Sequence, residues 1–306
     1  INNKGSNVIG GTSSAYRNVI SDNTNSGIFI TGASATNTTI KGNYIGIAAD
    51  GTTLISGNAQ ATGVYLDSSA PATTIGGTGT GDGNVLSGNA STGIYTNTTT
   101  AVNLICGNII GPTATGATSL GSGNQKYGIH LVFGSANVIG GSTAAHKNTI
   151  SDNTTAGIYI FGSASNLIKG NYIGIATDGA TYITGNSQDY GVYMTNGARL
   201  NIVGGTNSGE GNIISGNYDG TAATGAGVFS NSTNTTGNTI VGNYIGTTAS
   251  GTRFTDNQVS GIEINGSPKN TIGGTTAAYR NIISANGVRA VSYTHLRAHE
   301  TKANLV

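Results

Sequence analysis

The chain has 306 residues, of which 51 are Gly, and only 8% are charged, against about 25% in an average soluble domain. The formal net charge of +1 leaves no basic surface for phosphates, so we expect no nucleic-acid partner. No run approaches the ~18 consecutive apolar residues of a membrane-spanning helix, so no membrane span is predicted. A polar, Gly-rich composition is typical of disorder, but the regular spacing of Ile and Val predicts a folded chain.

Five short sequence blocks recur about every 65 residues along the chain. In chain order they are Asn-x-(Ile/Val)-Gly-Gly from Asn7, Asn-x-(Ile/Leu)-Ser-x-Asn from Asn18, Gly-(Ile/Val)-aromatic from Gly27, a block that ends in Tyr-Ile-Gly at Gly46, and Gly-(Ile/Val)-x from Gly63. Each period therefore has two halves of roughly 30 to 35 residues, and each half has three short apolar segments.

These segments are too short for helices, and their β-branched residues between Gly, Asn, Asp and Ser indicate strands. Three strands per half predict a triangular coil. A short strand cannot bury its apolar face alone, so it stacks on the equivalent strand of the next coil. The sequence thus predicts an all-β chain with a single parallel β-helix of about nine coils, each with three short strands.

One β-branched residue in every coil follows the Gly of the third strand and is expected to point into the core. This inward column comprises Ile28, Val64, Ile94, Ile129, Ile158, Val192, Val228 and Ile262. In alternate coils a Gln lies three residues before that Gly, at Gln60, Gln125, Gln188 and Gln258, and we interpret these as structural corner residues.

Three stretches carry a resemblance to a known family: residues 242–247 read GNYIGT, 270–275 read NTIGGT and 280–286 read RNIISAN. They resemble right-handed parallel β-helix repeats of the pectin-lyase-like superfamily, in particular those of bacterial surface proteins. The resemblance covers about residues 5–288. It implies a right-handed β-helix and an extracellular or cell-surface location, with the export signal outside this fragment. It says little about activity, because the superfamily holds lyases, hydrolases, phage tailspikes and repeats without known chemistry.

The repeats predict one β-helix domain over residues 1–290, as part of a longer protein. Residues 291–306 are charge-dense and do not continue the repeat. They resemble the translated sequencing-adapter tails of metagenomic reading frames, so we expect an artefactual tail. Within it, His295 and His299 lack the His-Glu-x-x-His order of a zinc site.

The carboxylates follow the repeat and do not cluster. Asp22 and Asp152 share a column four coils apart, roughly 19 Å by the strand spacing. Asp82, His146 and Glu210 share a loop column with steps of about 10 Å, too far apart for one metal ion. We therefore predict no catalytic residue, no metal site and no cofactor.

A second column lies beside the inward one: Phe29, Tyr65, Tyr95, His130, Tyr159, Tyr193 and Phe229, followed by Glu263. Strand alternation places these side chains outside if the Ile28 column is inside. Their spacing is comparable with one sugar unit of an extended glycan, which makes them candidate carbohydrate-binding residues. The alternative is a cross-strand aromatic ladder that only stabilises the sheet. A different strand phase would bury the rings.

The sequence therefore favours a non-catalytic, monomeric surface module for adhesion or contact with a polysaccharide or cell-surface glycan. The alternative is a polysaccharide lyase or glycoside hydrolase of the same superfamily.

Overall fold

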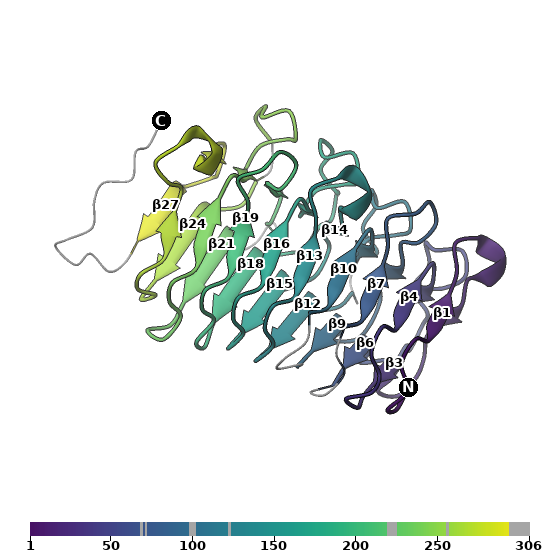
Figure 1. Cartoon of the computed structure of the whole chain (residues 1–306). Coiled ribbons are helices and arrows are strands. Elements are labelled where there is room, and N and C mark those ends of the chain that lie inside the picture. Colours follow the sequence, from purple (N-terminus) through teal and green to yellow (C-terminus); the bar gives the residue numbers. More distant parts are fainter. Residues whose placement is uncertain are drawn as a thin grey trace.

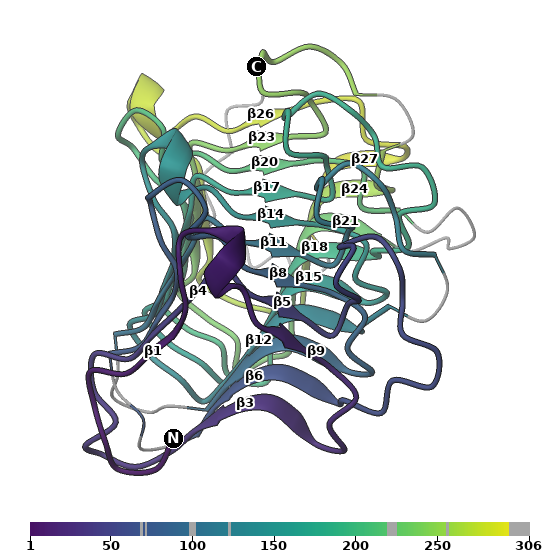
Figure 2. The same ribbon diagram turned by 90° about the vertical axis from the view of Figure 1, so that its right-hand side faces the viewer.

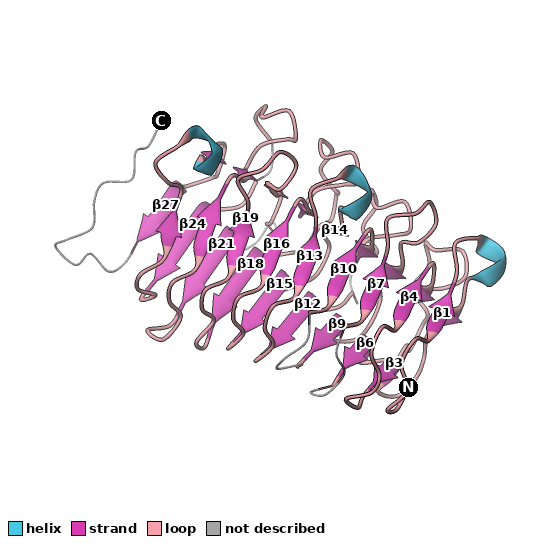
Figure 3. Ribbon diagram, in the orientation of Figure 1, coloured by secondary structure: helices cyan, strands magenta, loops and turns pink. Residues whose placement is uncertain are grey.

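The computed structural model describes residues 1–67, 70, 72–97, 102–121, 124–218, 225–254 and 257–293. Their strands form three parallel sheets of nine strands, and each coil contributes one strand to each sheet (Figures 1 and 3). The predicted all-β, right-handed parallel β-helix of nine three-stranded coils is confirmed. Figure 2 shows the strands of the second sheet stacked one above the other along the rod.

The first sheet contains β1 (Val8–Gly10), β4 (Thr39–Lys41), β7 (Thr74–Gly76), β10 (Leu104–Cys106), β13 (Val138–Gly140), β16 (Leu167–Lys169), β19 (Ile202–Gly204), β22 (Thr239–Val241) and β25 (Thr271–Ile272). The second contains β2 (Val19–Ile20), β5 (Tyr44–Ile45), β8 (Val85–Leu86), β11 (Ile109–Ile110), β14 (Thr149–Ile150), β17 (Tyr172–Ile173), β20 (Ile213–Ile214), β23 (Tyr244–Ile245) and β26 (Ile282–Ile283).

The third contains β3 (Ser26–Ile30), β6 (Thr62–Leu66), β9 (Thr92–Thr96), β12 (Tyr127–Val132), β15 (Ala156–Phe161), β18 (Tyr190–Thr195), β21 (Ala226–Asn231), β24 (Ser260–Asn265) and β27 (Arg289–Tyr293). The described loops contain three short 3-10 helices, η1 (Ser14–Tyr16), η2 (Ala144–His146) and η3 (Ala277–Tyr279). No helix in this described part of the chain has the length and apolar character needed to cross a membrane.

The predicted inward column forms part of the core. Ile28 pairs with Val64, the same pairing continues from coil to coil, and the column is 0% exposed from Val64 to Ile262. The other walls of the triangle are Ile, Val and Leu side chains of the first and second sheets, such as Ile40 and Ile45. Full burial of one such side chain contributes roughly 1.5–3 kcal/mol, so the repeated columns supply the main stabilisation of the rod.

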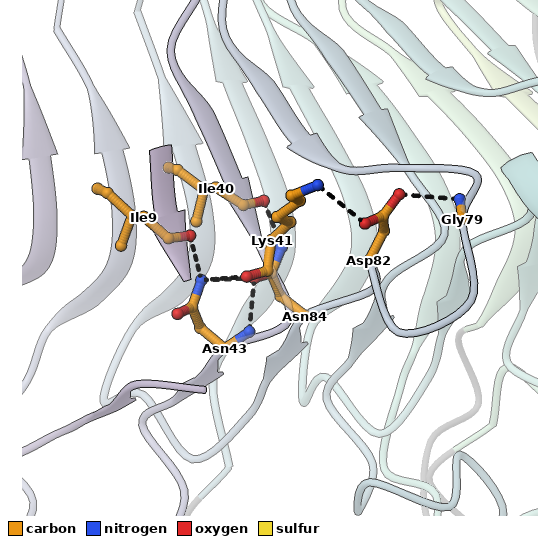
Figure 4. Close-up of polar contacts among 7 residues, drawn as sticks. All are labelled: Ile9, Ile40, Lys41, Asn43, Gly79, Asp82 and Asn84. Carbon is orange, nitrogen blue, oxygen red and sulfur yellow. Dashed lines mark hydrogen bonds and ion pairs between the residues drawn. The ribbon is translucent and has the colours of Figure 1, made fainter. Parts of the chain in front are cut away.

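A ladder of Asn side chains runs along the corner between the first and second sheets. The Asn43 Nδ2 donates to the Ile9 carbonyl at 2.9 Å and to the Asn84 Oδ1 at 3.0 Å (Figure 4). The ladder comprises Asn18, Asn43, Asn84, Asn108, Asn148, Asn171, Asn212, Asn243 and Asn281. It satisfies backbone groups that would otherwise be buried without a partner at each turn.

The predicted corner glutamines belong to a second amide ladder, before the third sheet. Asn23 donates to the Gln60 Oε1 at 2.7 Å, and the Gln60 Nε2 donates to the Asn89 Oδ1 at 2.9 Å. The alternation of Asn and Gln continues to Gln258, whose Nε2 donates to Asn286 at 2.7 Å. All four glutamines are 0% exposed, which confirms their structural role.

The boundary predicted after residue 290 lies inside a strand. β27 pairs with β24, and Val291 lies opposite Ile262. Val291 therefore extends the inward column by one more coil. Val291 and Tyr293 pack against the core, so residues 291–293 belong to the ninth coil. Residues 294–306, including His295 and His299, lie outside the described residues.

Candidate functional site

The column of rings lies on the outer face of the third sheet. The strands pair in register, so that Phe29 lies opposite Tyr65 and Tyr65 opposite Tyr95. The register continues through His130, Tyr159, Tyr193 and Phe229 to Glu263. We call the seven residues from Phe29 to Phe229 the aromatic column.

The column points away from the core, because the residues on either side of each ring are buried. Ile28 and Ile30 are 6% and 0% exposed, whereas Phe29 between them is 44% exposed. The rings from Tyr65 to Tyr193 are half-buried, and Phe229 is only 8% exposed. The outer face of the column is therefore open at its N-terminal end and becomes covered toward the C-terminal end.

Neighbouring rings in the N-terminal half pack edge to face. The ring centroids of Phe29 and Tyr65 are 5.2 Å apart, those of Tyr65 and Tyr95 are 4.7 Å apart, and those of Tyr95 and His130 are 5.2 Å apart. The interplanar angles are 70°, 78° and 84°. Such pairs each add about 0.5–1.5 kcal/mol, so the column stabilises the sheet as well as presenting rings to the outside.

Two further rings, which the sequence did not single out, cover the C-terminal half. Tyr127 stacks on Tyr159 with centroids 4.7 Å apart and an angle of 10°, and Tyr190 stacks on Phe229 at 5.0 Å and 15°. Both are the first residue of their strand. The available signal was a Tyr directly before the Gly of the third strand, which occurs in only these two coils of the described repeats.

A groove of about 380 Å³ lies beside the N-terminal half of the aromatic column. Tyr65 and Tyr95 line it on the side of the column, and Thr62 and Thr92 lie at the strand position that Tyr127 occupies in the fourth coil. Tyr127 also lines the groove. The groove therefore combines aromatic rings with neutral hydroxyl groups, as sugar-binding surfaces require.

The rings of the column and the side chains that line the groove are uncharged at neutral pH, and the Asp67 carboxylate lies near Tyr65 and Tyr95. Burial, together with this carboxylate, raises the pKa of the Tyr65 and Tyr95 hydroxyls, and burial raises the pKa of Tyr159 to about 12. Burial also lowers the pKa of His130 from 6.5 to about 4, so its imidazole is neutral. The His130 Nε2 is buried and has no hydrogen-bond partner among the described residues.

This environment predicts acid sensitivity that originates from His130. Its pKa is lower in the folded than in the unfolded chain, so only the unfolded chain takes up the proton between pH 6.5 and about pH 4. The stability contribution is present above pH 6.5 and is lost as the pH falls through this window, by up to about 3 kcal/mol. The denaturant midpoint of the wild type should therefore fall relative to that of His130→Phe as the pH is lowered from 7 to 4.

The Phe variant is a suitable reference because Phe already occupies the column at Phe29 and Phe229. Other titrating groups are common to both proteins and cancel in the comparison. Parallel pH profiles of the two proteins would contradict the assignment.

The acidic residues and His146 that the sequence analysis placed in repeat columns lie in separate environments. Asp152 is buried and accepts hydrogen bonds from the Ser119 Oγ and the Leu120 N–H, both at 2.8 Å, while Asp22 is exposed. Lys41 lies 3.2 Å from the Asp82 carboxylate (Figure 4), and Lys169 lies 2.8 Å from that of Glu210.

The remaining member of that loop column, His146, contacts the Thr143 hydroxyl at 2.7 Å. Within the described ranges, no three His, Cys, Asp or Glu side chains form a group able to hold a metal ion. The free Cys106 is buried, and desolvation raises its pKa to about 11, so it is a thiol at neutral pH.

Comparison of the chain with protein-family models, with curated proteins and with solved structures gave no match. The structure establishes the parallel β-helix itself, and the candidate site rests on the geometry of the third sheet.

Proposed function

We propose that this chain is a non-catalytic extracellular or cell-surface repeat module, related to the pectin-lyase-like superfamily, that binds an extended polysaccharide along the aromatic column. The observation that carries the proposal is the column itself. Seven rings on consecutive coils lie in register on the outer face of one sheet, and the N-terminal part of that face is open.

The spacing of the rings favours a long ligand. Successive centroids from Phe29 to His130 are 4.7 to 5.2 Å apart, close to the ~4.8 Å distance between strands. This step is comparable with one sugar unit, so neighbouring sugars of an extended glycan can contact successive rings. Because the rings and the groove lining are uncharged and the nearby Asp67 is acidic, ring contacts and neutral hydrogen bonds are the available forces. These forces favour a neutral glycan.

The arrangement of the carboxylates favours binding over cleavage. Glycoside hydrolysis uses two carboxyl groups on opposite sides of one bond. Here Asp82 and Glu210 each form an ion pair with a lysine of the preceding coil. Asp152 accepts hydrogen bonds from Ser119 and Leu120 of a loop. These groups have partners away from the aromatic column, which supports a role in folding.

The combined change Phe29→Ala and Tyr95→Ala, at two open rings two coils apart, should weaken binding of a long neutral oligosaccharide by about a hundredfold, corresponding to ~2.7 kcal/mol for two lost ring contacts. Binding of a disaccharide should change much less, because a short ligand does not need both rings. Isothermal titration calorimetry with cellohexaose, xylohexaose, mannohexaose and their disaccharides measures this difference.

The matched control is Tyr16→Ala with Tyr279→Ala. Both tyrosines lie in the 3-10 helices, away from the column, and are 69% and 41% exposed. This control should bind the hexasaccharides as the wild type does. Equal losses in the two double variants, or wild-type affinity in the column variant, would refute the proposed surface.

A further inference from the structure

The first residue of the third-sheet strand is a tyrosine in the fourth and sixth coils and a threonine in the second and third coils. Tyr127 begins β12 in the fourth coil, and its ring lies flat on Tyr159 of the fifth coil. Tyr190 begins β18 in the sixth coil, and its ring lies flat on Phe229 of the seventh. A planar group from the first strand position thus covers the column ring one coil further on.

The second and third coils have Thr62 and Thr92 at this first strand position. The rings one coil further on are Tyr95 and His130. The groove of about 380 Å³ is lined by all four of these side chains, and Tyr127 lines it as well. At Thr62, the place that a tyrosine ring occupies in the fourth and sixth coils is therefore open space, whereas Thr92 is only 2% exposed.

We infer that this groove is the primary subsite of the glycan contact, and that it takes one neutral sugar ring flat against Tyr95, with His130 beside it, in the place of the tyrosine ring that is missing at Thr62. The inference rests on the proposed function. It adds where the glycan is held most firmly and which class of sugar fits there.

The lining of the groove supports a neutral sugar. It contains Tyr, Thr, Ser, Asn, Ala and His130, and none of these side chains is charged at neutral pH because the pKa of His130 is about 4. A carboxylate or sulfate would lose water here without gaining a cation. A sugar hydroxyl, in contrast, finds neutral hydroxyl and amide partners among the Thr, Ser and Asn side chains of the lining.

Two reciprocal substitutions test the subsite. Thr62→Tyr should place a ring over Tyr95 and fill the groove, so the affinity for the best-bound of cellohexaose, xylohexaose and mannohexaose should fall by at least about tenfold. Tyr190→Thr changes the same strand position in the sixth coil, outside the groove, and uncovers Phe229, so that affinity should stay equal or rise. If aromatic area alone decided binding, the two variants would have the opposite order of affinity.

Both variants use residues that the chain itself places at this strand position, and near-wild-type melting temperatures are expected for both. A second measurement needs no variant: the imidazole nitrogen signals of His130 should shift in the wild type on saturation with the same hexasaccharide. An unchanged signal, or equal or tighter binding by Thr62→Tyr, overturns the subsite.

The outcomes separate the two claims. Failure of the wild type to bind any of the three hexasaccharides counts against the proposed function, and the subsite fails with it. Binding that depends on Phe29 and Tyr95 but is unaffected by Thr62→Tyr leaves the column as the binding surface and rejects only the groove.

Discussion

Replacement of Gly174 by Ala should lower the free energy of unfolding by about 2–5 kcal/mol, one of the two largest effects that we expect of a single substitution. Gly174 has a φ of +81°, and a Cβ atom there would lie 2.3 Å from the carbonyl oxygen of Ser215 in the next coil. The left-handed conformation costs Ala about 1–2 kcal/mol, and relief of the clash requires the coils to separate, at about 1–3 kcal/mol more. Urea denaturation followed by circular dichroism measures the change.

Gly57→Ala is the matched control. Gly57 has a similar φ of +73°, but an added Cβ would meet no atom within 4 Å. Only the conformational cost of about 1–2 kcal/mol applies there. Equal destabilisation by the two substitutions would show that the close approach of coils at Gly174 does not require glycine.

Asn148→Ala should destabilise the rod by about 2–4 kcal/mol. The Asn148 Oδ1 accepts hydrogen bonds from the backbone N–H and the side-chain amide of Asn108, at 3.0 and 3.1 Å. Its Nδ2 donates to the Ile105 carbonyl at 2.9 Å and to the Asn171 Oδ1 at 2.8 Å. Alanine removes all four bonds inside the molecule, where each unpaired group costs about 1–3 kcal/mol. The shift of the urea midpoint measures the loss.

Asn18→Ala removes the same residue type from the same ladder at its exposed end. There the exposed side-chain amide donates to the Asn43 Oδ1, and water can replace the lost partner. We expect a loss of less than about 1 kcal/mol. A loss at Asn18 as large as that at Asn148 would mean that burial of the ladder is not what makes it stabilising.

The coil architecture was predictable because the sequence repeats the same side chains at the same strand positions. Ile28 and its equivalents follow a Gly in each coil, and the side-chain period of two then assigns Phe29 and its equivalents to the outer face. The corner glutamines were recognisable for the same reason. The exact partner of each amide was not, because it depends on loops of different length between coils.

The covering of the aromatic column could not be predicted from alternation. Alternation gives the face on which a ring lies, but Phe29 is 44% and Phe229 is 8% exposed because Tyr190 covers the latter. That contact joins residues of different coils and different strand positions. The groove beside Tyr95 has the same origin, since it exists because Thr62 and not Tyr begins the second coil's strand.

Equivalent positions in the repeat also differ in environment. Asp22 and Asp152 occupy the same column, yet only Asp152 is buried, because Ser119 and Asn124 of a neighbouring loop enclose it. Burial raises the pKa of Asp152, while the hydrogen bonds from the loop act in the opposite direction. The sequence assigns both residues to one class because the enclosing loop comes from another part of the chain.

The most direct test of the central claim is the affinity of the wild-type chain for a series of neutral β-1,4-linked oligosaccharides, from disaccharide to octasaccharide, measured by calorimetry at neutral pH. A linear surface of rings on consecutive coils predicts that affinity rises with each added sugar until the ligand spans the open part of the column, and then levels off. Affinity independent of ligand length, or no binding at any length, would contradict the account.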